Sequence, residues 1–220
     1  MDILSQLNPQ QQEAVTAPAG QVLVLAGPGS GKTRVLTHRI AYLIGSLGVR
    51  AHNILAVTFT NKAAREMDAR LGRLLGESGK GIWLGTFHAN CARILRREVQ
   101  RLPLKSDFVI YDADDQLSLV KRAERDLNVD DKVFRPASMQ SAISAAKNNL
   151  VLPGDYTARN YREEVAARVY GRYQELLTAN NAVDFDDLLF FAVRLMQENP
   201  EVGRRYAERF QHVLVDEFQD

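Results

Sequence analysis

The stretch LVLAGPGSGKTRVL (23–36) decides the fold. It matches the relaxed form of the phosphate-loop pattern, in which Ala26 stands where the strict pattern has a glycine. The pattern carries chemistry when a strand precedes it and a helix follows it. The apolar run QVLVLAG (21–27) predicts the strand, and the residues from Lys32 to about Leu47 predict the helix. This context favours a nucleotide-binding loop over a glycine-rich turn that matches by chance.

The residue types in this loop suit the phosphate groups of a nucleotide. Gly27, Gly29 and Gly31 let the backbone bend so that its N–H groups point inward, and the start of the following helix adds partial positive charge. Lys32 is expected to reach the β and γ phosphates, and Thr33 to offer its hydroxyl to Mg²⁺. The residues of the loop expected to bind the nucleotide are Ala26, Gly27, Pro28, Gly29, Ser30, Gly31, Lys32 and Thr33.

Three further apolar runs repeat the strand pattern. ILAVTFT (54–60) and IWLGTFH (82–88) are each followed by a helical pattern, over residues 62–75 and 90–102 respectively, and HVLVDE (212–217) is the last. Continuous apolar runs that alternate with helices are typical of a parallel sheet covered by helices on both faces. The sequence therefore predicts an α/β fold.

A long region without strand patterns interrupts this alternation. Helices are predicted over residues 111–128, 137–150, 161–180 and 186–197. We interpret this region as an all-helical insertion subdomain within the α/β domain. The predicted division is 1–107 for the first part of the α/β domain, 108–189 for the insertion and 190–220 for the rest of the α/β domain.

The acids at the end of the last run complete the chemistry of the phosphate loop. In phosphate-loop enzymes an acid at the end of a neighbouring strand holds Mg²⁺, usually through water, and Asp216 stands in that place. Glu217 can orient and deprotonate the water that attacks the γ-phosphate. The alternative is a pair of acids that cap a strand in solvent. With the loop upstream, the pair predicts nucleoside triphosphate hydrolysis, with Lys32, Asp216 and Glu217 as catalytic residues.

Composition excludes some classes of protein and leaves others open. The 220 residues are 45% hydrophobic and 25% charged, which is ordinary for a globular protein, and no apolar stretch approaches the roughly 20 residues that span a bilayer. Cys91 is the only cysteine, so no disulfide forms within the chain, and we expect a reducing compartment and a cytoplasmic location. A net charge of +1 neither supports nor excludes a DNA partner, and the basic run at 91–105 is equally well a solvated helix face.

Six segments together carry a resemblance to a known family. They are LNPQQQEAV (7–15), AGPGSGKTRVLTHRIAYL (26–43), VTFTNKAAREM (57–67), GTFHANCARILR (85–96), VDFDDL (183–188) and VDEFQD (215–220). In this order they resemble the N-terminal part of a superfamily 1 DNA helicase of the UvrD/PcrA/Rep group. The resemblance covers essentially the whole chain and implies a RecA-like motor domain with ATP and Mg²⁺ as cofactors.

The resemblance also assigns the nucleotide base and a path for single-stranded DNA. It places Gln11 at the adenine, where the side-chain amide can bond N6 and N7, and Arg34 beside the nucleotide. Phe59 and Phe87 would stack on unpaired bases, although core packing is the simpler interpretation of either phenylalanine alone. The residues that the resemblance assigns to DNA are Thr58, Phe59, Thr60, Asn61, Lys62, Thr86, Phe87 and His88.

Expectations for the helical insertion are less specific. In the family this subdomain lies beside the DNA, so Lys147 could face duplex DNA, and a solvated lysine is the equal alternative. Asp184, Asp186 or Asp187 is expected to cap the helix that follows and to tie the insertion to the core, without a catalytic role.

The sequence stops at Asp220, whereas the family has a second motor domain. We therefore expect a fragment of a longer helicase that moves 3′ to 5′ on single-stranded DNA, separates strands at single/double-strand junctions, and works with repair or replication proteins. The alternatives are a non-translocating ATP- and DNA-binding module, the motor part of a helicase–nuclease, and, more distantly, a phosphate-loop kinase. No membrane partner is expected.

Overall fold

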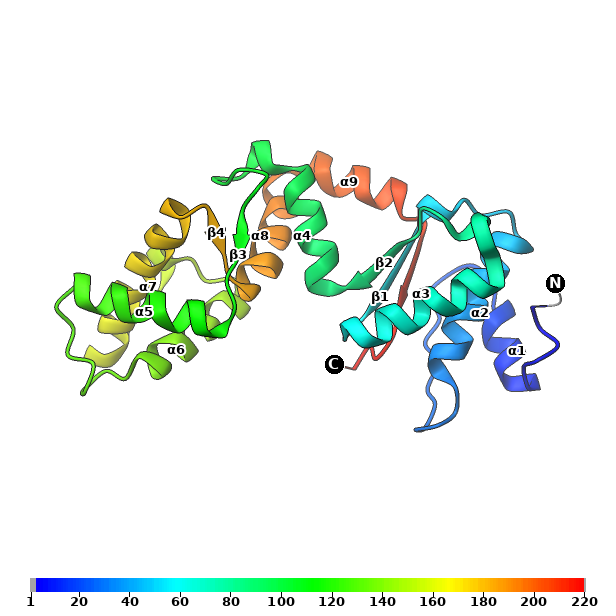
Figure 1. Ribbon diagram of the computed structural model, residues 1–220, viewed down its shortest axis with the longest axis horizontal. Coiled ribbons are helices and arrows are strands. Elements are labelled where there is room, and N and C mark those ends of the chain that lie inside the picture. Colours follow the sequence, from blue (N-terminus) through cyan, green and yellow to red (C-terminus); the bar gives the residue numbers. More distant parts are fainter. Residues whose placement is uncertain (1–2, 220) are drawn as a thin grey trace. The chain divides into compact units, whose positions relative to one another are not determined.

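Three parallel strands form the sheet that positions the motifs identified in the sequence. In the computed structural model, which describes residues 3–219, the strand order is β2 (Trp83–Thr86), β1 (Ile54–Thr58) and β5 (His212–Val215). Leu55 of β1 lies opposite Trp83 on one side and opposite Val213 on the other. The three strands run side by side in Figure 1, so their carboxyl ends share one edge. The predicted α/β class with a parallel sheet is confirmed.

The chain divides into two compact units, and each is described by itself. The sheet unit comprises residues 1–90 and 203–220, and the helical unit comprises residues 91–202. The predicted boundaries at 107 and 189 differ from this division and stay predictions. Within residues 3–219, none of the helices combines the length and the apolar composition that a bilayer crossing requires.

Helices pack against both faces of the sheet. The elements of the sheet unit besides the strands are α1 (Pro9–Thr16), α2 (Lys32–Gly45), η1 (Ala51–Asn53), α3 (Asn61–Leu75) and η2 (Gly76–Gly79), together with parts of α4 (Phe87–Arg97) and α9 (Pro200–Arg209). Ala56 and Leu84 face a core that α2 and α3 complete with Ile40 and Met67. Trp83, next to Leu84, points to the opposite face because side chains alternate along a strand.

On that opposite face Trp83 lies in an aromatic cluster with the end of α9. Its ring contacts Phe210 edge-on with centroids 5.0 Å apart and lies 6.2 Å from the ring of Tyr206. The guanidinium of Arg209 lies 4.9 Å from the Trp83 ring centroid. The Trp83 side chain is fully buried, so this cluster holds the end of α9 against this face of the sheet.

The helical unit has its own core. Its elements besides the ends of α4 and α9 are η3 (Val99–Arg101), β3 (Val109–Ile110), α5 (Ala113–Asp126), α6 (Pro136–Asn148), η4 (Pro153–Asp155), α7 (Tyr161–Ala179), β4 (Ala182–Val183) and α8 (Phe185–Glu198). The core is formed mainly by α5, α6 and α7, through residues such as Val120, Ile143 and Val169. Asp112 and Asp184 begin α5 and α8 with capping boxes, so the prediction that an acid of VDFDDL caps the next helix is confirmed.

The predicted strand at 21–27 is wrong. Residues 21–27 are irregular, and the side chains of Val22, Leu23, Val24 and Leu25 are between 43% and 87% exposed. A strand exists only through hydrogen bonds to a neighbouring strand, and within the described residues β5 pairs with β1 alone. Apolar composition therefore indicates a segment that suits a strand. It does not indicate whether a neighbouring strand is there to form hydrogen bonds with it.

Three smaller expectations also need correction. The apolar run at 212–215 predicts a buried strand, but the observed β5 is not buried, since Val213 is 58% exposed. The helical region contains the short strands β3 and β4, which pair in parallel. Lys147 neither faces solvent nor is placed to face DNA, because its side chain is fully buried within the helical unit.

Candidate functional site

The phosphate loop is an exposed turn between the irregular run and α2. Gly29 and Gly31 adopt φ angles of +74° and +85°, in the left-handed region that other residues rarely enter. A Cβ on Gly31 would also lie 3.0 Å from Nε2 of Gln11. Within the loop the backbone N–H and the hydroxyl of Ser30 both donate to the carbonyl of Gly27, at 3.4 and 2.7 Å. The loop therefore has the tight curvature that brings backbone N–H groups together.

Lys32 begins the helix that follows the loop. Its ammonium donates to the carbonyl of Ala26 at 3.4 Å, so the side chain folds back over the loop rather than extending into solvent. The N-terminus of α2, whose N-cap is Gly31, adds partial positive charge at the same place. Both features favour an anion at this loop.

One contact joins the loop to the far end of the sequence. The hydroxyl of Thr33 donates to Oδ2 of Asp216 at 3.1 Å. The backbone N–H of Asp216 donates to the carbonyl of Val57 at 2.9 Å, which continues the β1–β5 ladder one residue past the strand and fixes the carboxylate at the sheet edge. Asp216 is 7% exposed. The structure therefore brings together the two residues predicted to serve the metal ion.

This pair of oxygens fits Mg²⁺. The ion takes oxygen ligands, keeps several waters and is usually held by only one or two carboxylates together with the phosphates of the substrate. A hydroxyl and a carboxylate next to a phosphate loop match that donor set. Among residues 3–219 no group of three or more His, Cys, Asp and Glu side chains gathers into a protein-only metal site.

Glu217 occupies an unusual backbone conformation beside Asp216. Its φ angle is +53°, in the left-handed region, where a non-glycine residue stores conformational strain. Its carboxylate accepts a hydrogen bond from Nε2 of Gln219 at 2.6 Å. Asp216 and Glu217 lie in a bend that directly follows β5, so both acids stand at the strand end. Sequence reasoning missed Gln219 as a partner.

The two residues assigned to the nucleotide base are engaged in local contacts. The Gln11 amide accepts from the backbone N–H of Asn8 at 3.1 Å and donates to the carbonyl of Ser30 at 2.9 Å, so it ties α1 to the phosphate loop. The guanidinium of Arg34 donates to the carbonyl of Gln6 at 2.7 Å. Both residues lie next to the loop, and their contact with a base stays a prediction.

Two exposed phenylalanines mark the same edge of the sheet. Phe59 follows β1 and is 58% exposed, and Phe87 follows β2 and is 43% exposed. Neither Phe59 nor Phe87 is therefore packed in the core, which was the alternative interpretation. Because β1, β2 and β5 are parallel, both rings lie at the edge that also carries Asp216.

The hydroxyls around these rings mostly hold turns. Thr58 is buried and donates to the carbonyl of Thr60 at 3.1 Å, whereas the hydroxyls of Thr60 and Thr86 accept from backbone N–H groups at 3.1 and 3.2 Å. Asn61 and Lys62 are exposed in the first turn of α3, and His88 is half-buried. The threonines therefore shape the strand-to-helix turns, and the exposed groups near the two rings are Thr60, Asn61 and Lys62.

Comparison with known proteins agrees with this geometry. Residues 7–220 match the family described as UvrD/REP helicase N-terminal domain. The ATP-dependent DNA helicase PcrA of Bacillus subtilis (strain 168) is 48% identical over 220 residues, which are 99% of this chain and 30% of that protein. PcrA of Staphylococcus aureus (strain Mu50) and of Staphylococcus epidermidis (strain ATCC 35984) are each 46% identical over the same shares of the two chains.

The chain thus spans about 30% of the length of the curated relatives it matches. The family match itself covers nearly the whole chain, from the segment before α1 to the acids after β5, and includes the phosphate loop and both phenylalanine turns. The domain described by this family has the RecA-like phosphate-loop fold. This chain belongs to the UvrD/REP helicase N-terminal domain family.

Proposed function

We propose that this chain supplies the ATP-binding and DNA-binding part of the motor of an ATP-dependent DNA helicase. The relatives carry that activity in their names, and the sheet edge holds groups suited to both a nucleotide and unpaired bases. The motor would move 3′ to 5′ on single-stranded DNA, separate strands at junctions and act in the cytoplasm with repair or replication proteins.

The contact between Thr33 and Asp216 carries this proposal. It joins the phosphate loop to the end of β5 across 183 positions of sequence, at 3.1 Å. A solvated cap would not require a hydroxyl from the loop helix to meet a largely buried carboxylate. Two oxygen donors that meet beside a phosphate loop are the arrangement that phosphate-loop NTPases use.

Each residue around the loop has a role in this proposal. Lys32 binds the β and γ phosphates, and Thr33 and Asp216 hold Mg²⁺, which when bound supplies charge neutralisation at those phosphates. Glu217 accepts the proton of the attacking water from its place directly after Asp216. Gln11 selects adenine, with Arg34 beside it.

The DNA would cross the exposed aromatic rings. Phe59 and Phe87 offer stacking faces at the ends of neighbouring strands, while Asn61 and Lys62 are available for phosphates and sugars. A phosphate-loop kinase has no use for two exposed phenylalanines at this edge. For the 220 residues alone we expect weak binding of Mg·ATP, slow turnover and no unwinding, because the resemblance assigns the other wall of the ATP cleft to a second motor domain.

The experiment is binding of a fluorescently labelled oligo(dT) to this chain, measured by anisotropy against a duplex of equal length. We expect a preference for the single strand. Stacking is worth about 1–3 kcal/mol per base, so Phe59→Ala and Phe87→Ala should each weaken binding by about 5- to 150-fold. Tyr161→Ala, which removes a ring that is 68% exposed from the helical unit, is the control. Equal binding of single strand and duplex, or equal effects of all three variants, would refute the proposed DNA site.

A further inference from the structure

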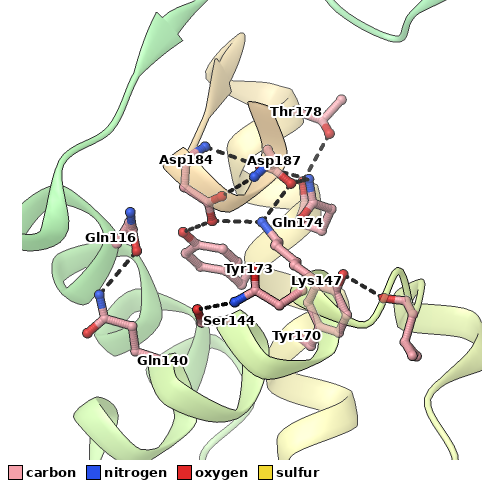
Figure 2. Close-up of polar contacts among 12 residues, drawn as sticks. Gln116, Gln140, Ser144, Lys147, Tyr170, Tyr173, Gln174, Thr178, Asp184 and Asp187 are labelled. Carbon is pink, nitrogen blue, oxygen red and sulfur yellow. Dashed lines mark hydrogen bonds and ion pairs between the residues drawn. The ribbon is translucent and has the colours of Figure 1, made fainter. Parts of the chain in front are cut away.

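A buried cluster of charges in the helical unit is not used by the proposed motor chemistry. Lys147 on α6 is fully buried, and its ammonium forms ion pairs with Asp184 Oδ2 and Asp187 Oδ1, both at 2.7 Å. Asp184 is the N-cap of α8 and Asp187 lies one turn into that helix. Figure 2 shows the lysine between the two carboxylates. The cluster therefore joins the start of α8 to α6.

Helix α7 closes the cluster with aromatic and amide groups. The hydroxyl of Tyr173 donates to Asp184 Oδ2 at 2.8 Å, and its ring centroid lies 5.1 Å from the Lys147 ammonium. Burial, followed by the nearby carboxylates, raises the pKa of Tyr173, so the hydroxyl remains a donor at any physiological pH. The Gln174 amide nitrogen lies 3.5 Å from both oxygens of Asp187. Three helices thus converge on one lysine.

The two aspartates also cap the start of α8. The carboxylate of Asp184 accepts from the backbone N–H of Asp187 at 2.8 Å, and the carboxylate of Asp187 accepts from the backbone N–H of Asp184 at 3.2 Å. This capping box satisfies N–H groups at the start of α8. Each carboxylate therefore pairs with Lys147 through one oxygen and caps α8 through the other, so loss of the ion pairs would disturb the helix start directly.

The charges in the cluster do not balance. One ammonium meets two carboxylates, so full ionisation leaves one uncompensated negative charge in a buried place, which is costly. Burial, and then repulsion from Asp184, raises the pKa of Asp187 to about 6, against the opposing effect of Lys147. The groups that act on the cluster come from all three helices: Lys147, Tyr170, Tyr173, Asp184, Asp186 and Arg194.

A protonated Asp187 has a hydrogen-bond acceptor nearby in the side chain of Gln174. The side-chain oxygen of Gln174 is buried and has no hydrogen-bond donor among residues 3–219. Rotation of that amide exchanges its oxygen and nitrogen, so Gln174 can donate to an ionised Asp187 and accept from a protonated one. Gln174 can therefore bond Asp187 in either protonation state without movement of a helix.

We propose that Lys147, Asp184 and Asp187 form a proton-linked lock on the start of α8, which tightens when the cluster takes up one proton. Uptake leaves one ammonium and one carboxylate, a balanced pair, and keeps the capping box. Release restores the excess negative charge and eases local opening of α8. In sequence, α8 and α9 lead from this lock to β5 and Asp216.

The test is hydrogen exchange of the 220-residue chain, followed by mass spectrometry of peptides from the start of α8 and expressed as protection factors. These factors remove the intrinsic pH dependence of amide exchange. With a pKa of about 6 for Asp187, protection in the native sequence should be about tenfold greater at pH 5 than at pH 8. Peptides from α5 provide an internal reference.

Two variants distinguish a lock from ordinary packing. Lys147→Met leaves two carboxylates buried without their cation, so protection at pH 8 should fall on the order of 100-fold or more, and the loss should shrink at pH 5. Asp187→Asn removes the excess charge while an amide oxygen can still cap α8. It should match or exceed native protection at pH 8 and lose the pH dependence.

The partly exposed ion pair between Arg172 and Asp126 supplies the control, because Arg172→Met should change protection of α8 by less than about fivefold. Equal native protection at pH 5 and pH 8 would overturn the proposal. So would an Asp187→Asn variant that loses as much protection as Lys147→Met. If Lys147→Met does not fold, the pH profiles of the native chain and of Asp187→Asn decide the question.

Discussion

Replacing Glu124 by leucine should stabilise the helical unit, and more so at high pH. Glu124 lies on α5, its side chain is 1% exposed, and neither carboxylate oxygen has a hydrogen-bond donor within the described part of the chain. Burial, and then repulsion from Asp131, raises its pKa from 4.5 to about 7, although Lys121 opposes the rise. A carboxyl with a raised pKa favours the fold only when protonated, so its contribution is lost as the pH rises from 4.5 through 7.

The size of the effect follows from that shift. A difference of about 2.5 between folded and unfolded pKa values corresponds to about 3 kcal/mol at pH 8, and to about 1 kcal/mol at pH 5, where the unfolded carboxyl is only partly protonated. The stability gained through Glu124→Leu should therefore be about 2 kcal/mol larger at pH 8 than at pH 5.

Urea unfolding followed by circular dichroism at 222 nm at both pH values measures this difference. Trp83 fluorescence, which reports the sheet unit, should be unchanged. Glu164→Leu changes an exposed glutamate of α7 and serves as the control. An equal gain at pH 5 and pH 8, or a loss at pH 8, would refute the assignment of Glu124 as a buried and unsatisfied acid.

Three further predictions concern single residues. Gly31→Ala should weaken Mg·ATP binding at least tenfold in a titration with a fluorescent ATP analogue, because φ is +85° and the new Cβ would meet Gln11; unchanged affinity would contradict the loop geometry. Burial raises the pKa of the Cys91 thiol to about 11, so alkylation by iodoacetamide at pH 8 should be at least tenfold slower than that of glutathione, and an equal rate would count against this. Trp83→Ala should cost about 3–5 kcal/mol in urea unfolding, since the ring is buried against Phe210, and a cost below 1 kcal/mol would contradict that packing.

Local patterns predicted the core of the sheet unit well. The runs that contain β1, β2 and β5 are apolar and precede helical patterns, and parallel strands place their carboxyl ends at one edge. That rule alone places Phe59, Phe87 and Asp216 at the same edge of the sheet, the one formed by the carboxyl ends of the strands. The approach of Thr33 to Asp216 follows because each lies directly beyond the loop or strand that the pattern identifies.

Features that depend on distant partners could not be predicted. Residues 21–27 have the composition of a strand, yet pairing with a neighbour is a property of the whole sheet. Lys147 lies in a helix whose pattern allows a surface position, and its burial depends on acids 37 and 40 positions away. The strands β3 and β4 have two residues each, which is too short for a periodic pattern.

Glu124 is a feature that the sequence did signal. It falls on the same helical stripe as Leu117, Val120 and Leu127, at the spacing of three and four residues that marks a buried face. An acid at such a position predicts either a buried partner or a shifted pKa. Attention to the polar residue within the apolar stripe, rather than to the apolar residues alone, would have identified it.

The most direct test of the proposed motor site is Mg²⁺-dependent binding of a fluorescent ATP analogue to this chain. Thr33 and Asp216 meet at 3.1 Å beside the phosphate loop, so binding should be tighter with Mg²⁺ than with EDTA. Asp216→Asn should abolish the gain from Mg²⁺, whereas Asp68→Asn, which changes an exposed acid of α3, should retain it. If the Asp216→Asn variant keeps the full Mg²⁺ dependence, the acid is only a strand cap and the proposed site is wrong.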